Sequence, residues 1–403
     1  MIKNLTNVRG ITCWGAHTGV KSLRRDLAIV FSEVPASAAA VFTQNQVVAA
    51  PVTLSKKHIK NGKAQAIVIN SGNANAATGD EGMRGAEAMA ETLADELKID
   101  KEMVLVASTG VIGVPFPTED IVKGIKENAS KLTSKSNAGS FFANAILTTD
   151  TFAKEGFIEF NVDGYEVNMA GVAKGSGMIH PNMATMLAFI VTDVAIDSKL
   201  LQKTVKEAVD KSFNMITVDG DSSTNDMVVV LANGKAKNEE FKTKNDKGFD
   251  EFKKNLEEMM MHLAKQIVSD GEGASKHIEY QIVNSKSEKK ARTLIRAIST
   301  SVLVKTAMYG RDPNWGRIIS AAGNAGVPFD YKKIDLYLGS DDKLIHVLGK
   351  GVPVEFNRNY MKKLLRESHI VIKLDLNEGK ANAKGWGTDL TTDYVLFNSV
   401  YTT

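Results

Sequence analysis

Thr185 occupies a position at which the chain could cleave itself and then use the new N-terminal residue as a nucleophile. Thr185 follows the glycine-punctuated segment 171–184 and directly precedes an apolar run from Met186 to Val191. Such a run has the length of a strand buried on both faces, which would hold Thr185 in place. A threonine hydroxyl becomes an effective nucleophile when a base sits beside it, and its own α-amine is such a base once the preceding bond is cut. The pattern predicts self-cleavage between Ala184 and Thr185.

The freed α-amine suits this role because its pKa of about 7.7 to 8.0 lies near working pH. Gly175 and Gly177 have no Cβ, so the backbone before Thr185 can adopt angles that other residues disfavour. Pro181 fixes one backbone angle just before the cleavage point. By itself, however, a threonine at the start of a core strand is an ordinary feature. The rest of the chain must decide between a strand start and a cleavage point.

The wider context of Thr185 resembles the ornithine acetyltransferase family, enzymes of arginine biosynthesis also called glutamate N-acetyltransferases. The segment K-G-S-G-M-I-H-P-N-M-A-T-M-L, residues 174–187, matches the family's cleavage segment. One departure is Ala77, where the family often has cysteine, but the expected mechanism needs no thiol. Further motifs follow in the family's order along nearly the whole chain: Asn70 to Ala76, Ser108 to Gly113, Thr148 to Thr151, Thr217 to Asp226, Asp270 to Lys276, Lys305 to Ala307, Gly310 to Arg317 and Asn398 to Thr403.

This resemblance assigns roles to residues whose individual sequence signals are weak. Thr109 and Gly110 follow a predicted strand, where a hydroxyl and a backbone N–H can point into one space. In the family this pair stabilises the oxyanion that forms on the attacked carbonyl. The resemblance also implies substrate contacts for Thr148, Lys174, Thr185, Glu272, Asn398 and Thr403.

Two of these residues carry charges that an amino acid substrate needs. Lys174 offers a cation to an α-carboxylate, although a lysine is more often a solvated surface charge. Glu272 lies between Gly271 and Gly273, and flanking glycines permit the close approach of a ligand ammonium.

Other kinds of site find little support in the sequence. The acidic run that starts at Asp219 resembles a calcium loop, but its sixth position is Thr224 rather than glycine and its twelfth is Val230 rather than glutamate. We interpret it as a structural turn near the site. A lone Cys13 excludes an internal disulfide and a cysteine-rich zinc site. His180 lies near the cleavage point, but the freed amine makes it unnecessary as a base. P-loop, dinucleotide and zinc-protease motifs are missing, so we expect no metal and no bound cofactor.

Composition indicates an ordinary globular enzyme. Lysine and arginine number 50 against 47 acidic residues, and hydrophobic residues make up 43% of the 403 positions. This balance predicts neither a nucleic acid nor a membrane as partner. The first ten residues lack an apolar signal region, so we expect a cytoplasmic protein.

Strands and helices alternate along the chain, which predicts an α/β fold with helices around stacked β-sheets. The resemblance implies a layout similar to that of self-cleaving N-terminal-nucleophile hydrolases. Helices are predicted at Glu81 to Leu97, Leu200 to Phe213 and Phe249 to Ile267, and a surface loop at Lys235 to Lys247. Strands are predicted at Leu27 to Phe31, Ala66 to Ile69, Met103 to Val106, Met186 to Val191, Met227 to Leu231, Leu303 to Val304 and His369 to Leu376.

The resemblance therefore implies acetyl transfer from N-acetylornithine to glutamate by a ping-pong mechanism through an acetyl-threonine. Cleavage would give an α chain, residues 1–184, and a β chain, residues 185–403, interleaved into one unit and assembled as a heterotetramer of two of each. Whether acetyl-coenzyme A also serves as donor stays open. Two alternatives are a self-cleaving aminopeptidase of similar fold and an inactive, uncleaved binding protein.

Overall fold

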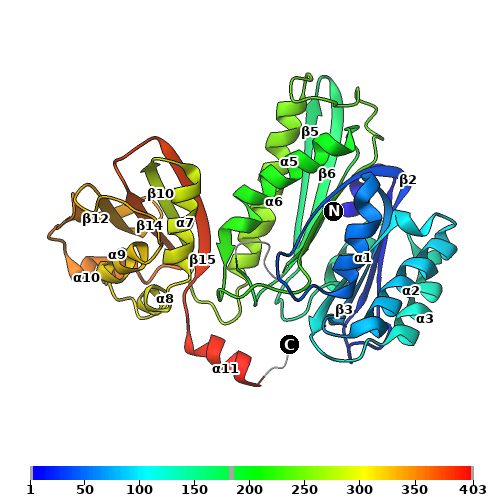
Figure 1. Cartoon of the computed structure of the whole chain (residues 1–403), viewed down its shortest axis with the longest axis horizontal. Coiled ribbons are helices and arrows are strands. Elements are labelled where there is room, and N and C mark those ends of the chain that lie inside the picture. Colours follow the sequence, from blue (N-terminus) through cyan, green and yellow to red (C-terminus); the bar gives the residue numbers. More distant parts are fainter. Residues whose placement is uncertain (1–2, 181–185, 401–403) are drawn as a thin grey trace.

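The computed structural model describes residues 3–180 and 186–400, which form an α/β protein in two bodies (Figure 1). Its larger body contains a sheet with the strand order β4, β3, β2, β9, β7, β6, β5, in which β1 also pairs with β2. These strands are β1 (Ile11–Ala16), β2 (Leu27–Phe42), β3 (Lys63–Asn73), β4 (Val104–Val111), β5 (Lys154–Val162), β6 (Tyr165–Lys174), β7 (Leu187–Thr192) and β9 (Met227–Ala232).

Strand β2 is long enough to serve two halves of this sheet. Residues 27–31 lie between β1 and β3, whereas residues 37–42 pair with β9. The register with β3 shifts between Phe31 and Ala36, on either side of Pro35, which has no N–H to donate to a partner strand. One strand therefore joins the half that contains β3 and β4 to the half that contains β5, β6 and β7.

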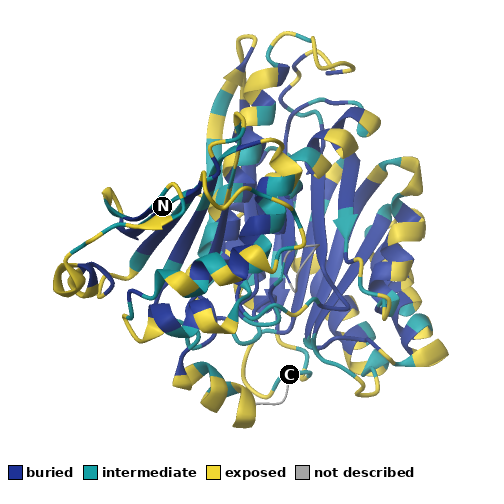
Figure 2. Cartoon of the chain, turned by 60° about the vertical axis from the view of Figure 1, so that its left-hand side comes forward, coloured by how far each residue is buried: buried dark blue, intermediate teal, exposed yellow. Residues whose placement is uncertain are grey.

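The two halves lie face to face (Figure 1). Apolar side chains from both halves form one buried cluster between them. Ile67 and Leu105 from one half belong to the same buried cluster as Val172, Phe189 and Val229 from the other. Burial is therefore nearly continuous along inner strands such as β3, β7 and β9, and exposed residues lie mainly on the helices and loops (Figure 2).

Helices cover both outer faces, so the layers run helix, sheet, sheet, helix (Figure 1). On one side lie α1 (Ala50–His58), α2 (Gly79–Leu97) and α3 (Thr118–Asn128), and on the other α5 (Ser198–Lys211) and α6 (Phe249–Ser269). Helix α4 (Ser136–Ala145) packs against β1 and β2. The predicted α/β sandwich of helices around stacked sheets is confirmed.

The smaller body contains a second sheet with the order β13, β12, β11, β14, β10, β15, β8. Its helix α7 packs against β10 and β15. The strands are β8 (Ile216–Thr217), β10 (His277–Ser285), β11 (Asp335–Ser340), β12 (Lys343–Gly349), β13 (Val352–Pro353), β14 (His369–Asp375) and β15 (Ala381–Thr388), and the helices are α7 (Glu288–Ser299), α8 (Val302–Tyr309), α9 (Trp315–Gly323) and α10 (Arg358–Leu364).

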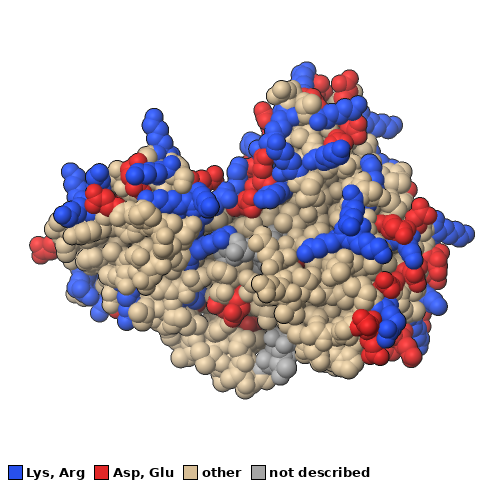
Figure 3. Space-filling model, viewed as in Figure 1, with Lys and Arg blue, Asp and Glu red and all other residues tan. Residues whose placement is uncertain are grey.

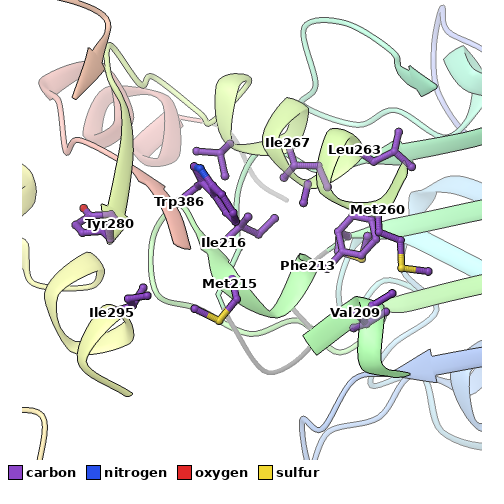
Figure 4. Close-up of a cluster of buried hydrophobic side chains, with 14 of the residues drawn as sticks. Val209, Phe213, Met215, Ile216, Met260, Leu263, Ile267, Tyr280, Ile295 and Trp386 are labelled. Carbon is purple, nitrogen blue, oxygen red and sulfur yellow. The ribbon is translucent and has the colours of Figure 1, made fainter. Parts of the chain in front are cut away.

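A continuous apolar core joins the two bodies (Figure 4). Phe213, Met260 and Ile267 come from the side of the sandwich, and Tyr280 and Trp386 come from the second sheet. Strand β8 strengthens this junction, because it precedes α6 in the chain but pairs with β15 of the smaller body. Helix α11 (Thr392–Val400) then returns from β15 toward the sandwich (Figure 1). Short 3₁₀ turns occur at Leu5–Asn7, Ile59–Asn61, Lys101–Met103, Ala129–Lys131 and Phe213–Met215.

Most of the predicted elements are present, and one is wrong. The predicted strand at Leu303 to Val304 is part of helix α8. Ser301 caps this helix by accepting the N–H of Val304, and Leu303 is 58% exposed, so the short apolar run is not a buried strand. No helix among the described residues is long and apolar enough to cross a lipid bilayer.

Candidate active site

A cavity of about 980 Å³ is lined by loops of the sandwich and by residues of helix α11, among them Tyr394 and Asn398. Loops at the ends of β1, β4, β6 and β8 contribute to its wall. Ala184, Thr185 and Thr403 lie outside the described residues. The other residues that the sequence predicted for the site all line this cavity: Thr109, Gly110, Thr148, Lys174, Glu272 and Asn398.

Thr109 and Gly110 lie at the end of β4, fixed by parallel pairing with Ser71 and Gly72 of β3. The backbone of Gly110 has φ 131°, and a Cβ there would lie 2.3 Å from the carbonyl carbon of Gly72. Only glycine therefore fits, because the two strands approach too closely for a side chain. This close pairing holds the Thr109 hydroxyl and the neighbouring N–H groups at the cavity wall.

Lys174 ends β6 and places its ammonium beside Thr109. Its Nζ donates to Thr109 Oγ1 at 3.4 Å and lies 4.0 Å from Asp150 Oδ2. Burial lowers the pKa of Lys174, while the Asp150 carboxylate opposes that shift. Because the lysine donates to the Thr109 oxygen, the hydroxyl proton of Thr109 stays free for an acceptor in the cavity.

A network of buried charged side chains lies next to Lys174. Lys154 is fully buried and donates to Asp150 Oδ1 at 2.5 Å and to Asp270. Asp150 also accepts the N–H groups of Thr148 and Gly175. Burial alone would raise the pKa of Asp150, but the ammonium groups of Lys174 and Lys154 bring it to about 2. Asp150 therefore stays ionised at neutral pH and fixes the backbone at Thr148 and at Gly175, the residue after Lys174.

Glu272 enters the cavity from the loop after α6. A Cβ on Gly177 would lie 2.2 Å from the Glu272 carboxylate, and one on Gly273 would lie 2.4 Å from the backbone nitrogen of Tyr394. Asn398 of α11 donates to Glu272 Oε2 at 3.2 Å. The glycines around Glu272 thus admit the carboxylate on one side and the start of α11 on the other.

The loop 217–226 holds both described flanks of the segment 181–185. On one flank, Asp219 accepts the N–H groups of Met178 at 2.6 Å and Ile179 at 2.9 Å. On the other, Asp226 Oδ1 accepts the N–H of Met186 at 3.1 Å. Burial raises the pKa of Asp219 to about 6 and raises that of Asp226 well above its usual range. The acidic run that we interpreted as a structural turn thus anchors the chain on both sides of the predicted cleavage point.

The sequence analysis missed several polar residues of this region. Lys21, Arg24, Asp221 and Tyr394 line the cavity, and Lys154 and Asp270 lie behind it. Asp270 lies within a family motif, but nothing in the sequence showed that it meets Lys154 across more than a hundred residues. His180, whose Nδ1 lies 3.4 Å from Thr217 Oγ1, has its pKa lowered by burial.

Comparisons with known proteins agree with the motifs. The ArgJ family model matches residues 12–403. The arginine biosynthesis bifunctional protein ArgJ of Caldanaerobacter subterraneus subsp. tengcongensis is 48% identical, with 98% of this chain and 97% of that protein covered. The ArgJ protein of Thermotoga neapolitana is 49% identical, with 98% and 99% covered. A crystal structure of an ornithine acetyltransferase complexed with ornithine, from Mycobacterium tuberculosis, is 33% identical, and the match covers 44% of this chain and 95% of that one with a TM-score of 0.40.

Proposed function

The chain belongs to the ArgJ family, and from this we infer that it is an enzyme of arginine biosynthesis that transfers an acetyl group from N-acetylornithine to glutamate. The observation that best supports this reaction in the structure is the meeting of Thr109, Lys174 and Glu272 at one cavity. Acyl transfer needs donors for an oxyanion and fixed charges for an amino acid, and these side chains offer both.

The first step is self-cleavage. The Thr185 hydroxyl attacks the carbonyl carbon of Ala184, the peptide bond breaks, and water hydrolyses the resulting ester. This step leaves a carboxylate on Ala184 and a free α-amine on Thr185. The anchoring of Met178 and Ile179 by Asp219, and of Met186 by Asp226, supports it by limiting how far the two ends can move.

Acetyl transfer then runs in two halves. The Thr185 oxygen attacks the acetyl carbonyl while its proton passes to the α-amine, and the oxyanion is met by the Thr109 hydroxyl and the Gly110 N–H. The bond to the ornithine nitrogen breaks, that nitrogen takes the proton, and ornithine leaves. The neutral α-amine of glutamate next attacks the acetyl ester and gives up a proton to the Thr185 α-amine, the bond to the threonine oxygen breaks, that oxygen takes the proton back, and N-acetylglutamate is released.

The two pieces are expected to stay together after cleavage. Strand β6 of residues 1–184 pairs with β7 of residues 185–403, and β2 of the first piece pairs with β9 of the second. Separation would expose several strand edges and the apolar core between them. We also propose that two copies of each piece form a heterotetramer and that the reaction needs no metal or resident cofactor. A cytoplasmic location, and acetyl-coenzyme A as a second donor, stay predictions.

Mass spectrometry of the purified protein tests the whole scheme. We expect two masses, for residues 1–184 and 185–403, and one acetyl group on the second piece after addition of N-acetylornithine. Glutamate should remove this acetyl group and yield N-acetylglutamate.

Other outcomes would favour the alternatives. Loss of the acetyl group to water at the same rate without glutamate would favour an aminopeptidase-like hydrolase. A single intact chain that takes up no acetyl group would favour the inactive binding protein.

A further inference from the structure

The proposed reaction sets a problem for one cavity, because its two amino acids end in opposite charges. Ornithine carries an ammonium at its distal end and glutamate carries a carboxylate. Lys174, Glu272 and Asn398 do not by themselves explain how both ends are accepted. The cavity wall holds further charged side chains, of which Arg24 and Asp221 are exposed to solvent.

The cationic side of the cavity comes from the loop between β1 and β2. Asp26 is fully buried and accepts the N–H groups of Thr18 and Lys21, which fixes this loop. The Lys21 ammonium donates to the carbonyl oxygens of Leu147, at 2.5 Å, and Arg25, at 3.1 Å. Burial lowers the pKa of Lys21 to about 8, so the side chain is largely charged at neutral pH.

Arg24 follows in the same loop and is less constrained. Its Nη1 lies 3.5 Å from the backbone oxygen of Thr148, a residue predicted to contact substrate. That single long contact leaves most of the five guanidinium N–H groups available to a ligand. Arg24 therefore offers a planar cation of the kind that binds carboxylates with two parallel hydrogen bonds.

The anionic side of the cavity comes from the loop 217–226 and from Glu272 in the loop after α6. Asp219 is occupied by the N–H groups of Met178 and Ile179, so it is structural. Asp221 differs, because its carboxylate makes no hydrogen bond or ion pair with any described side chain that would neutralise it. Burial, together with Asp219, Glu272 and Asp221, raises the pKa of Tyr394 on the same wall, as expected in a negative field.

The two walls differ in the sign of the exposed charge that each presents, Arg24 on one and Asp221 on the other. The pKa of Lys21 responds to the carboxylates of Asp26 and Asp150 as well as to the cations of Lys174 and Arg24, whereas the charged groups that act on the pKa of Tyr394 are the carboxylates of Asp219, Glu272 and Asp221. In the face that Figure 3 shows, one small group of acidic side chains lies in the hollow between the two bodies, and basic side chains lie above it on both bodies. A ligand with two differently charged ends would be oriented by such a division.

We propose that the cavity has two distal subsites of opposite charge, in which Arg24 receives the distal carboxylate of glutamate and Asp221 receives the distal ammonium of N-acetylornithine. This proposal rests on the acetyl transfer inferred above. Lys21 contributes charge to the first subsite without needing to touch the ligand. The shared α-carboxylate stays at the inner wall, and the two side chains leave it toward different walls.

Separate measurement of the two half reactions tests this division. In Arg24→Ala, removal of the acetyl group by glutamate should slow by about 3- to 10-fold at subsaturating glutamate, the size expected for one partly solvated charge pair, while acetylation by N-acetylornithine stays unchanged. In Asp221→Asn the pattern should reverse. Both side chains are exposed, so melting temperatures should match that of the wild type.

Neutral substrates of the same shape sharpen this test. Glutamine replaces the distal carboxylate by an amide, and N-acetylnorvaline lacks the distal amine. Wild-type enzyme should prefer glutamate to glutamine, and Arg24→Ala should lose that preference while Asp221→Asn keeps it. For the donor, the wild-type enzyme should prefer N-acetylornithine to N-acetylnorvaline. Asp221→Asn should lose that preference, while Arg24→Ala keeps it. Each comparison of two substrates in two enzymes thus isolates one charge contact.

Arg84→Ala and Asp95→Asn on helix α2 are matched controls, because both residues are exposed and neither lines the cavity. Equal slowing of both half reactions in either cavity variant, or a preference for charged substrates that survives both substitutions, would overturn the two subsites. If the wild-type enzyme forms no acetyl-enzyme at all, acetyl transfer itself is wrong and this proposal falls with it.

Discussion

The charged residues at the two ends of the cavity differ in burial and in ion pairing. At its inner end, which we define by Lys154, Asp150 and Lys174, the side chains are at most 4% exposed and every charge has an opposite charge within 4.0 Å. At its mouth, defined by Arg24 and Asp221, the charges are exposed and have no ion-pair partner among the described residues. The same chemical groups should therefore contribute very differently to folding and to binding.

This difference follows from the cost of removing a charge from water. A buried charge must be paired, and removal of its partner strands it in a medium of low polarity. An exposed charge is hydrated and screened, so its loss costs the fold little. The inner end should therefore determine whether the protein folds and reacts, while the mouth should determine only how well each substrate is held.

The largest expected effect is complete loss of function in Thr185→Ala. This variant should remain a single chain and should transfer no acetyl group, because the same missing hydroxyl serves both reactions. A denaturing gel and mass spectrometry after prolonged incubation measure the cleavage. Arg24→Ala is the matched comparison at the mouth and should be cut as fully as the wild type. Cleavage of Thr185→Ala between residues 184 and 185 would contradict the mechanism.

The buried network predicts the next largest effect, on stability. In Lys154→Met, Asp150 and Asp270 lose the ammonium between them, and we expect a loss of about 3 to 5 kcal/mol in the free energy of unfolding. Lys211→Met is the surface control, since it removes a partly exposed pair with Glu257 and should cost at most about 1 kcal/mol. Denaturant unfolding of both variants measures the difference.

A second variant separates stranded charge from lost packing. Lys154→Met combined with Asp270→Asn removes one of the two carboxylates and should recover part of the lost stability. If Lys154→Met is no less stable than Lys211→Met, burial does not distinguish the inner end from the surface.

Loss of the oxyanion donor should reduce turnover without unfolding the protein. Thr109→Ala is expected to lower kcat by about 100- to 1000-fold, because the hydroxyl matters only when negative charge forms on the attacked carbonyl. Thr109→Ser keeps the hydroxyl and should retain most of the activity, which separates this role from packing. Steady-state kinetics and the melting temperature of both variants provide the measurement, and unchanged turnover in Thr109→Ala would remove that residue from the mechanism. Substitution of Gly110 is a poorer test, because a Cβ there meets the backbone of Gly72.

The sequence predicted Lys174 of the inner end and its neighbours on the cavity wall, but neither charge of the mouth. Thr109, Gly110, Lys174 and Glu272 lie in motifs whose order matches a known family, and the structure brings them to one cavity. The pairing of Lys154 with Asp270 could not be predicted, because a buried lysine looks in sequence like a solvated one until the partner from a distant segment is known.

The local sequence pattern was also insufficient to predict parts of the fold. The sandwich was predictable because its strands are continuous apolar runs and its helices carry clear stripes. Leu303 and Val304 gave a run too short to distinguish a strand from a helix, and the cap at Ser301 decided for the helix. The separate second sheet depends on pairings such as β8 with β15, which join residues far apart in sequence.

The smallest effects that still separate the two ends concern substrate binding by Lys174 and Glu272. Lys174→Met should weaken N-acetylornithine and glutamate together, because both carry the α-carboxylate that this lysine is placed to meet. Glu272→Gln should also weaken both, with more effect on glutamate, whose α-nitrogen is an ammonium where that of N-acetylornithine is an amide. Each lost charge-assisted hydrogen bond is expected to cost roughly 1.5 to 3 kcal/mol.

Steady-state kinetics with each substrate varied in turn measure these effects, and kcat must be followed with KM because Lys174 also donates to Thr109. Arg24→Ala and Asp221→Asn should instead weaken one substrate each. The two ends of the cavity thus differ in which substrates a substitution weakens, more than in how strongly it weakens them. Should Lys174→Met or Glu272→Gln impair N-acetylornithine alone, that residue belongs to the ornithine side chain, and the division into a shared inner end and a selective mouth is wrong.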